Sequence, residues 1–220
     1  MSKERKVLEF YVLCNRLKNV IRTGWKDWHV SADRLESVAE HIYSTQMLAI
    51  AIKYEYNYDI DLYKVIYMIA IHEIGENVIG DITIFDMPKE EKRRIEREAV
   101  LKIFKSFTNM EYVKELYFEF EKGETKEAKY AKHCDKLDCT LQAKLYDEQG
   151  SVDLNNQEDN KSFHDEEVQK LLKENNNSWS VMMLKLWQNK CDYDDNFNKI
   201  IDYACDNKIS DLSNYLIKKL

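Results

Sequence analysis

Hydrophobic and polar positions alternate with helical spacing along most of the chain. Near the N-terminus the apolar positions form one stripe: Val7, Leu8, Tyr11, Val12, Leu17 and Ile21. This stripe predicts a first helix that ends near Gly24, and residues 26–34, which show no periodicity, are expected to form a loop. Ser37 then precedes Glu40 at the spacing of a capping box, which predicts the start of a second, long helix.

The second and third predicted helices carry the clearest apolar faces. In the second helix this face also includes a histidine and a threonine: Val38, His41, Ile42, Thr45, Leu48, Ala49 and Ile52. The third helix is expected from about Leu62 through Glu76, where a run rich in Ile and Met ends in polar residues. Gly80 and Pro88 then punctuate a connecting loop.

The remainder of the chain also has helical patterns, separated by one long polar segment. Helices are expected over these ranges: 89–107, 111–121, 125–148, 164–174, 178–206 with a break near Asp192, and 209–219. Residues 150–162 are polar and predict a long loop. Without a convincing strand pattern or an internal repeat, the chain is predicted to be all-α. Residues 1–150 would form the core, and residues 151–220 a C-terminal helical extension packed on the same domain.

Composition supports a helical, soluble protein. The 220 residues include one Pro and five Gly, few turn-forming residues for a β-rich protein. The net charge of −7 argues against a nucleic-acid polymer as partner, because basic surfaces bind phosphate backbones, but it permits a small nucleotide. Five scattered cysteines without a C-x-x-C pair suggest reduced thiols. With no signal-peptide pattern and no apolar run of membrane length, we expect a cytoplasmic protein without a membrane partner.

Residues 68–81 concentrate the candidate chemistry. His72 and Glu73 end the apolar run, and Glu76 and Asp81 follow. In a continuous helix His72 and Glu76 would share one face. Burying such groups unpaired costs roughly several kcal/mol. A divalent cation would satisfy them together, which predicts a metal site.

Two other predicted helices offer ligand-type residues among apolar neighbours. His41 lies on the second helix and Asp135 on the helix over 125–148. Taken alone, His41 could be a hydrogen-bonded helix histidine and Asp135 a solvated acid. Together with His72 and Glu73 they make two imidazoles and two carboxylates, a set that suits Mn, Co, Fe, Zn or Mg without selecting sharply among them.

The order H…HE…D resembles the HD-domain superfamily of metal-dependent phosphohydrolases. Several segments resemble its 5′-deoxynucleotidase branch, which includes the HD domain-containing protein 2 group: Arg22–Trp25, Glu36–His41, His72–Ile82, Pro88–Lys92 and Asp135–Asp138. The resemblance covers about residues 5–148. It implies an HD-domain helical bundle with additional C-terminal helices.

The resemblance also implies a ligand set. A first metal would be held by His41, His72, Glu73 and Asp135. The family normally has aspartate where this chain has Glu73. The extra methylene group moves the carboxylate by about one C–C bond, which a flexible or bidentate ligand can absorb, with a change of metal preference or affinity as a consequence. A catalytically impaired helical binding module is the alternative.

Further roles follow from the same resemblance. Glu76 would take a proton from the attacking water, Arg22 would bind the substrate phosphate, and Trp25 would pack against the sugar or base, or serve only as a packing anchor. Glu76, Asp81 and the backbone of Ile82 resemble a second metal site, although Asp81 could equally be a helix-terminal acid.

The sequence therefore predicts an enzyme that releases phosphate from (deoxy)nucleoside 5′-monophosphates by attack of metal-activated water. A hydrolase of the same superfamily acting on another nucleotide or phosphate ester is the alternative within the class. The segment His72–Glu76 also invites comparison with the H-E-x-x-H zinc proteases, but these need a second histidine where Glu76 stands. The expected partner is a small nucleotide, and the charged helices after Pro88 leave a homodimer open.

Overall fold

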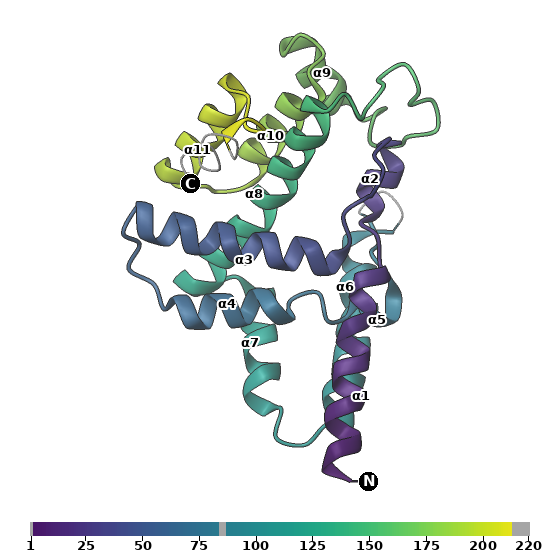
Figure 1. Ribbon diagram of the computed structural model, residues 1–220, viewed down its shortest axis with the longest axis vertical. Helices are drawn as coiled ribbons and strands as arrows, with labels where there is room; N and C mark the ends of the chain where they lie inside the picture. The colour runs from purple at the N-terminus through teal and green to yellow at the C-terminus, as the bar shows by residue number, and fades with distance from the viewer. Residues whose placement is uncertain (1, 84–86, 213–220) are drawn as a thin grey trace. The chain divides into compact units, whose positions relative to one another are not determined.

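The computed structural model describes residues 2–83 and 87–212, and helices make up its regular structure (Figure 1). Within these residues the only bridge pairing joins Ile21 to Ser37. The prediction of an all-α fold is therefore confirmed. The chain divides into two compact units, one of Met1–Trp25 with Leu35–Asp135 and one of Lys26–Arg34 with Lys136–Leu220. The predicted boundary near residue 150 stays a prediction.

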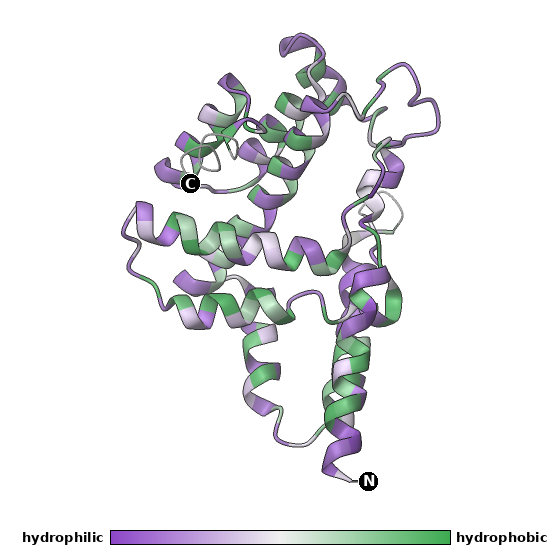
Figure 2. Cartoon of the chain, in the orientation of Figure 1, coloured by the Kyte–Doolittle hydropathy of each residue, from purple (hydrophilic) through white to green (hydrophobic). Residues whose placement is uncertain are grey.

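The first unit contains the helices that precede α8 and the start of α8 itself. Their bounds are α1 Lys3–Asn15, η1 Arg16–Asn19, α2 Thr23–Asp27, α3 Val38–Glu55, α4 Leu62–Ile71, α5 Glu76–Ile79, α6 Lys89–Ser106, α7 Glu111–Lys122 and α8 Lys126–Glu148. The helix α4 packs against α3 and α7 (Figure 1). Figure 2 shows α4 largely in hydrophobic colours, and its Val65, Met68 and Ile69 are fully buried.

The predicted capping box starts α3. The Ser37 hydroxyl accepts from the Glu40 N–H at 3.3 Å, and the Glu40 carboxylate accepts from the Ser37 N–H at 2.8 Å. Such caps stabilise a helix by about 1 kcal/mol. They also set the register of α3, which buries His41 and Thr45 on the face toward the core.

The N-terminal segment differs from the prediction. Instead of one helix to Gly24, α1 ends at Asn15, a 3₁₀ turn follows, and Gly24 lies inside the short helix α2. The chain leaves the helix because its backbone pairs with the segment before α3. Val38 N–H donates to Val20 C=O at 2.8 Å, and Arg22 N–H donates to Glu36 C=O at 3.1 Å. Because α2 reaches Asp27, the predicted loop begins later than residue 26.

The third predicted helix is also interrupted. The helix α4 ends at Ile71, residues 72–75 form turns, and α5 begins at Glu76. In this turn the Ile74 N–H donates to the Ile71 carbonyl and the Glu76 N–H donates to the Glu73 carbonyl. Each bond reaches back three residues, as in a 3₁₀ turn, rather than four as in an α-helix. His72 and Glu76 therefore do not share one face of a continuous helix, and that part of the prediction is wrong.

Close packing of α6 explains why a glycine stands in this turn. A Cβ atom at Gly75 would lie 2.7 Å from Cγ of Glu96 and 3.1 Å from a methyl group of Val100. Both neighbours belong to α6. The turn and α6 can therefore approach this closely only because residue 75 has no side chain.

The second unit holds the rest of α8 together with α9 Glu166–Glu174, α10 Trp179–Lys190 and α11 Asp195–Asp206. The predicted break near Asp192 is confirmed. Trp28 joins this unit: its ring centroid lies 5.6 Å from that of Trp179, and the Gln157 side-chain amide donates to its carbonyl at 3.0 Å. Of the helix predicted over 209–219, residues from 213 onward lie outside the described part.

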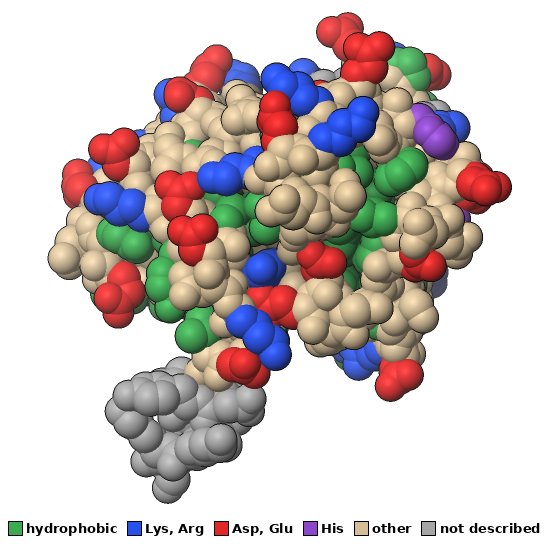
Figure 3. All heavy atoms as spheres, turned by 90° about the horizontal axis from the view of Figure 1, so that it is seen from above, with side chains coloured by type: hydrophobic (Ala, Val, Ile, Leu, Met, Phe, Trp, Pro, Cys, Tyr) green, Lys and Arg blue, Asp and Glu red, His purple; other side chains and the backbone are tan. Residues whose placement is uncertain are grey.

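Charged residues, 33% of the sequence, are visible on the surface (Figure 3). Acidic and basic side chains are interspersed over the face shown in Figure 3. Among the described helices, none is both long and apolar enough to cross a membrane.

Candidate metal centre

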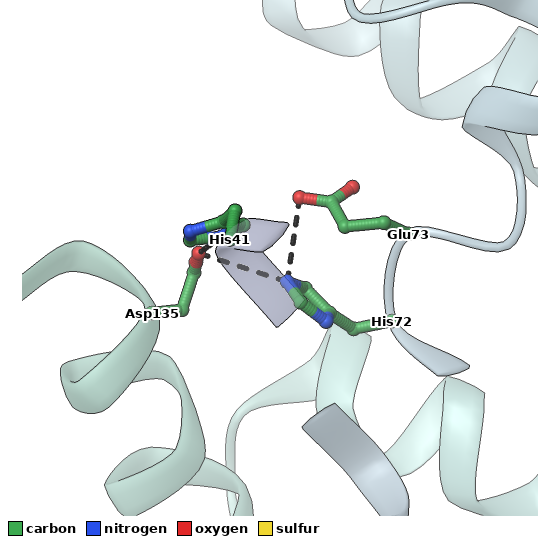
Figure 4. Close-up of side chains that lie close together, drawn as sticks. All are labelled: His41, His72, Glu73 and Asp135. Carbon is green, nitrogen blue, oxygen red and sulfur yellow. Dashed lines mark hydrogen bonds and ion pairs between the residues drawn. The ribbon is translucent and has the colours of Figure 1, made fainter. Parts of the chain in front are cut away.

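The four side chains predicted to hold the first metal lie together inside the first unit (Figure 4). His41 comes from α3, Asp135 from α8, and His72 and Glu73 from the turn after α4. Each offers a ligand atom, and these atoms all lie within 4.8 Å of one another. His41 is 0% exposed and both His72 and Asp135 are 4% exposed, so these three are shielded from bulk water, whereas Glu73 is partly exposed.

The two imidazoles direct their Nε2 atoms at the same carboxylate. His41 Nε2 lies 2.9 Å and His72 Nε2 3.6 Å from Asp135 Oδ1, and His72 Nε2 lies 3.3 Å from Glu73 Oε1 (Figure 4). Figure 4 shows all four side chains pointing toward a common centre. This is the arrangement in which a divalent cation accepts nitrogen and oxygen ligands at once.

His72 supplies the test of whether a cation fits. Its Nδ1 lies 2.7 Å from the carbonyl oxygen of Ile69, which can only accept, so Nδ1 carries the proton. The Nε2 atom is then the ligand atom; it is buried, makes no hydrogen bond of good geometry, and faces the Glu73 and Asp135 carboxylates. Ligand histidines usually donate a hydrogen bond from one ring nitrogen to a protein oxygen, which directs the other nitrogen at the metal. The residues present therefore fit a divalent cation.

Electrostatics lead to the same conclusion. Burial alone lowers the pKa of His72, but Glu73 and Asp135 outweigh it and raise that pKa to about 10. Burial raises the pKa of Glu73, whereas His72 and Arg22 bring it well below its usual range. Without a metal, a protonated His72 thus neutralises the carboxylates. A divalent cation would displace that proton.

Glu76 lies in the adjacent turn and is 2% exposed. Its Oε2 atom is buried without a hydrogen-bond partner, and its Oε1 atom lies 3.9 Å from Nζ of Lys92. Burial first, then Glu73 and Asp81, raise the pKa of Glu76 well above its ordinary value. A carboxyl group with a raised pKa accepts a proton more readily than an ordinary glutamate does.

The two residues predicted to bind substrate have different surroundings. Arg22 Nη1 lies 3.5 Å from Glu73 Oε1, which puts its guanidinium beside the metal cluster. Trp25 is 2% exposed, and its indole N–H donates to Glu36 at 2.9 Å. Trp25 therefore anchors α2 in the core of the first unit. Its contact with a sugar or base stays a prediction.

The residues of the predicted second metal site have protein partners. Asp81 Oδ2 accepts from the Thr23 N–H at 2.6 Å, and the Thr23 hydroxyl donates to the Asp81 carbonyl at 2.6 Å. Lys92 Nζ donates to the carbonyl oxygen of Ile82 at 2.6 Å. Whether Glu76, Asp81 and Ile82 bind a cation stays a prediction.

The sequence alone did not single out three residues near this site. Lys92 and Glu96 are four positions apart on α6, and the Tyr117 hydroxyl donates to Glu96 at 3.3 Å. Burial, then Glu73 and Glu121, raise the pKa of Glu96 to about 7. The four-residue spacing was a usable signal, but α6 carries so many charges that it did not stand out.

Fold and cluster together define an all-helical protein with a buried histidine–carboxylate centre. The model of the HD domain family matches residues 14–179, and the chain belongs to this family. It is an HD-domain phosphohydrolase, as the sequence resemblance implied.

Relatives and solved structures agree with this assignment. The chain is 34% identical over 150 residues to 5′-deoxynucleotidase HDDC2 of Dictyostelium discoideum, covering 64% of this chain and 78% of the relative. It is 36% identical over 149 residues to the Homo sapiens protein of the same name, covering 66% and 70%. A structure titled "Predicted metal-dependent phosphohydrolase" from Magnetospirillum magnetotacticum aligns with a TM-score of 0.54 at 26% identity, covering 68% and 72%. A conserved hypothetical protein of Pyrococcus furiosus shares the fold, with a TM-score of 0.60 at 24% identity over 90% and 98% of the two chains.

Proposed function

We propose that this protein hydrolyses nucleoside 5′-monophosphates, with deoxyribonucleotides as the preferred class, and that it uses a divalent cation held by His41, His72, Glu73 and Asp135. The observation that carries the proposal is the convergence of these ligand atoms within 4.8 Å, with the buried His72 Nε2 facing two carboxylates without a hydrogen bond to either. The relatives named 5′-deoxynucleotidase support the substrate class.

Each of the proposed ligand residues would have a distinct role at the metal centre. When bound, the cation would neutralise phosphate charge and lower the pKa of water. The bond from His72 Nδ1 to the Ile69 carbonyl keeps Nε2 directed at the centre. Asp135 lies between the two imidazoles and would balance the charge of the cation. Glu73 reaches both His72 and Arg22, so it joins the metal centre to the residue proposed to bind phosphate.

Glu76 is proposed to handle the proton of the attacking water. Its carboxylate is buried, has an unpartnered oxygen and has a raised pKa, so it favours proton uptake more than an exposed glutamate does. After the phosphorus–oxygen ester bond breaks, the same group can pass its proton to the leaving 5′-oxygen of the nucleoside.

Arg22 is proposed to bind the substrate phosphate. Guanidinium groups pair with phosphate in a charge-assisted, bidentate geometry. Arg22 already lies 3.5 Å from Glu73, so the phosphate would meet it beside the metal ligands rather than at a remote point. Trp25, buried three residues later, holds the short helix that follows Arg22 in place.

The test is phosphate release from ribo- and deoxyribonucleoside 5′-monophosphates by chelator-stripped protein with Mn, Co, Mg or Zn added back. Bound metal is measured in parallel. We expect metal-dependent release with a preference for deoxyribonucleotides. Bound metal without release from any monophosphate would refute the substrate class. Absence of both metal and release would show that Glu73 has left a non-catalytic module in an enzyme fold.

A further inference from the structure

Lys92 occupies an unusual position for a lysine on a strongly charged helix. It lies in the first turns of α6, and its Nζ donates to the carbonyl oxygen of Ile82 at 2.6 Å. The same Nζ lies 3.9 Å from Oε1 of Glu76. These two oxygens come from residues that the sequence resemblance assigns, together with Asp81, to a second metal. The ammonium group thus contacts two of the three expected ligand groups.

We propose that the Lys92 ammonium and a second divalent cation are alternative occupants of the position between Glu76 and Ile82. Both are cations that need the same oxygens, and two cations held a few ångströms apart repel strongly in a buried environment. A second cation can bind only when Lys92 leaves. The second site is therefore weaker than the first by the cost of displacing the ammonium.

The surroundings explain why a cation is needed there at all. The Glu76 side chain is 1% exposed, and its Oε2 atom has no hydrogen-bond partner. Asp81 adds negative charge nearby, because it is among the groups that raise the pKa of Glu76. A buried ionised carboxylate needs a nearby positive charge, and the Lys92 ammonium supplies one at 3.9 Å whenever the second cation is absent.

Lys92 also has a route out of this position. Its side chain is 24% exposed, and a lysine stem is flexible enough to move its head group into water. By contrast, the first metal cluster contains no lysine among its four ligand residues. Displacement of Lys92 should therefore affect only the second binding event. The inference concerns the site of the proposed function, but its test measures metal binding and not turnover.

The experiment is a Mn²⁺ titration of chelator-stripped protein, with free and bound metal separated by equilibrium dialysis. Wild type is compared with Lys92→Met and Lys92→Gln, which keep a similar side-chain length without the charge. In wild type we expect one tight site and a second that is much weaker. In both variants the second site should tighten at least about tenfold, since its competitor is gone, while the first stays within about threefold.

Two controls locate the effect. Lys102→Met removes a charge from an exposed position on the same helix and should leave both binding events unchanged. Adding Asp81→Asn to Lys92→Met should abolish the gain, because it removes the second carboxylate expected to bind the cation. Circular dichroism and thermal melting establish that each variant is folded before titration. If Lys92→Met does not fold, the comparison rests on Lys92→Gln.

Four results would overturn the inference. The first is a wild-type chain that binds two Mn²⁺ ions with equal affinity. The second is a Lys92 variant whose second site is unchanged or weaker than that of wild type. The third is a single Mn²⁺ in both wild type and the variants, which would mean that no second cation competes with Lys92. A gain that survives in the double variant would also contradict it, since the extra metal would then lie elsewhere.

Discussion

The half-buried Glu96 carboxyl group should make the stability of this protein depend on pH in a defined direction. Burial, then Glu73 and Glu121, raise the pKa of Glu96 to about 7, from an ordinary value of 4.5. A group whose pKa is higher in the folded chain contributes stability below its unfolded pKa and loses that contribution as pH rises through the folded value. The window for Glu96 is therefore about pH 4.5 to 8.

The size of the effect follows from the same values. One pKa unit corresponds to about 1.4 kcal/mol, so the rise to about 7 sets an upper limit of about 3 kcal/mol. Glu96 is half-buried, and solvent screening reduces the expected effect to about 1–2 kcal/mol. Glu96→Gln removes the titration and retains an oxygen that can accept from the Tyr117 hydroxyl.

The assay is urea unfolding of metal-free wild type and Glu96→Gln between pH 4.5 and 8.5. Relative to wild type, the variant should gain about 1–2 kcal/mol in free energy of unfolding as pH rises across this window. Glu98→Gln is the matched control, since Glu98 is exposed on the same helix and pairs with Arg94 at 2.8 Å. A difference between Glu96→Gln and wild type that does not change with pH, or that falls as pH rises, would refute the reasoning.

Three further outcomes are expected. Glu76→Gln should lower metal-dependent phosphate release by about 10²-fold or more while metal at the first site is retained, measured as turnover and bound metal on the same sample. Asp135→Asn should lose most of the bound metal after dialysis, and full retention would contradict its role as a ligand. Gly75→Ala should lower the free energy of unfolding in urea by about 1–3 kcal/mol, because the added Cβ would lie 2.7 Å from Cγ of Glu96. Gly24→Ala is the control, since a Cβ added there would meet no atom within 4 Å beyond its chain neighbours.

The amino-acid sequence alone indicated the long periodic helices and the four side chains that the fold brings together as a candidate metal centre. Ser37 and Glu40 predicted the start of α3 because a capping box is a local signal that depends on residues three positions apart. His41, His72 and Asp135 stood out because imidazoles and carboxylates are uncommon among apolar neighbours. Both kinds of signal are present without knowledge of what packs against the helix.

Other features were decided only by tertiary structure. The end of α4 at Ile71 was missed because no proline follows it before Pro88, and the contact that accompanies the turn is with α6, which packs against Gly75. Neither partner reveals this contact from its own sequence. In the same way, the N-terminal helix stops early because the backbone at Val20 pairs with that at Val38, a contact between segments that are separated along the chain.

The roles of Lys92 and Glu96 also depended on the fold. In the sequence both belong to a helix with interleaved charges, and although Pro88–Lys92 resembles the family, neither residue was assigned a role. The fold brings Nζ of Lys92 to the Ile82 carbonyl and the Tyr117 hydroxyl to Glu96, whose pKa is raised by burial. Residue type and helical spacing thus determined which groups could act, whereas packing between distant segments determined their partners, because desolvation and charge pairing depend on three-dimensional neighbours.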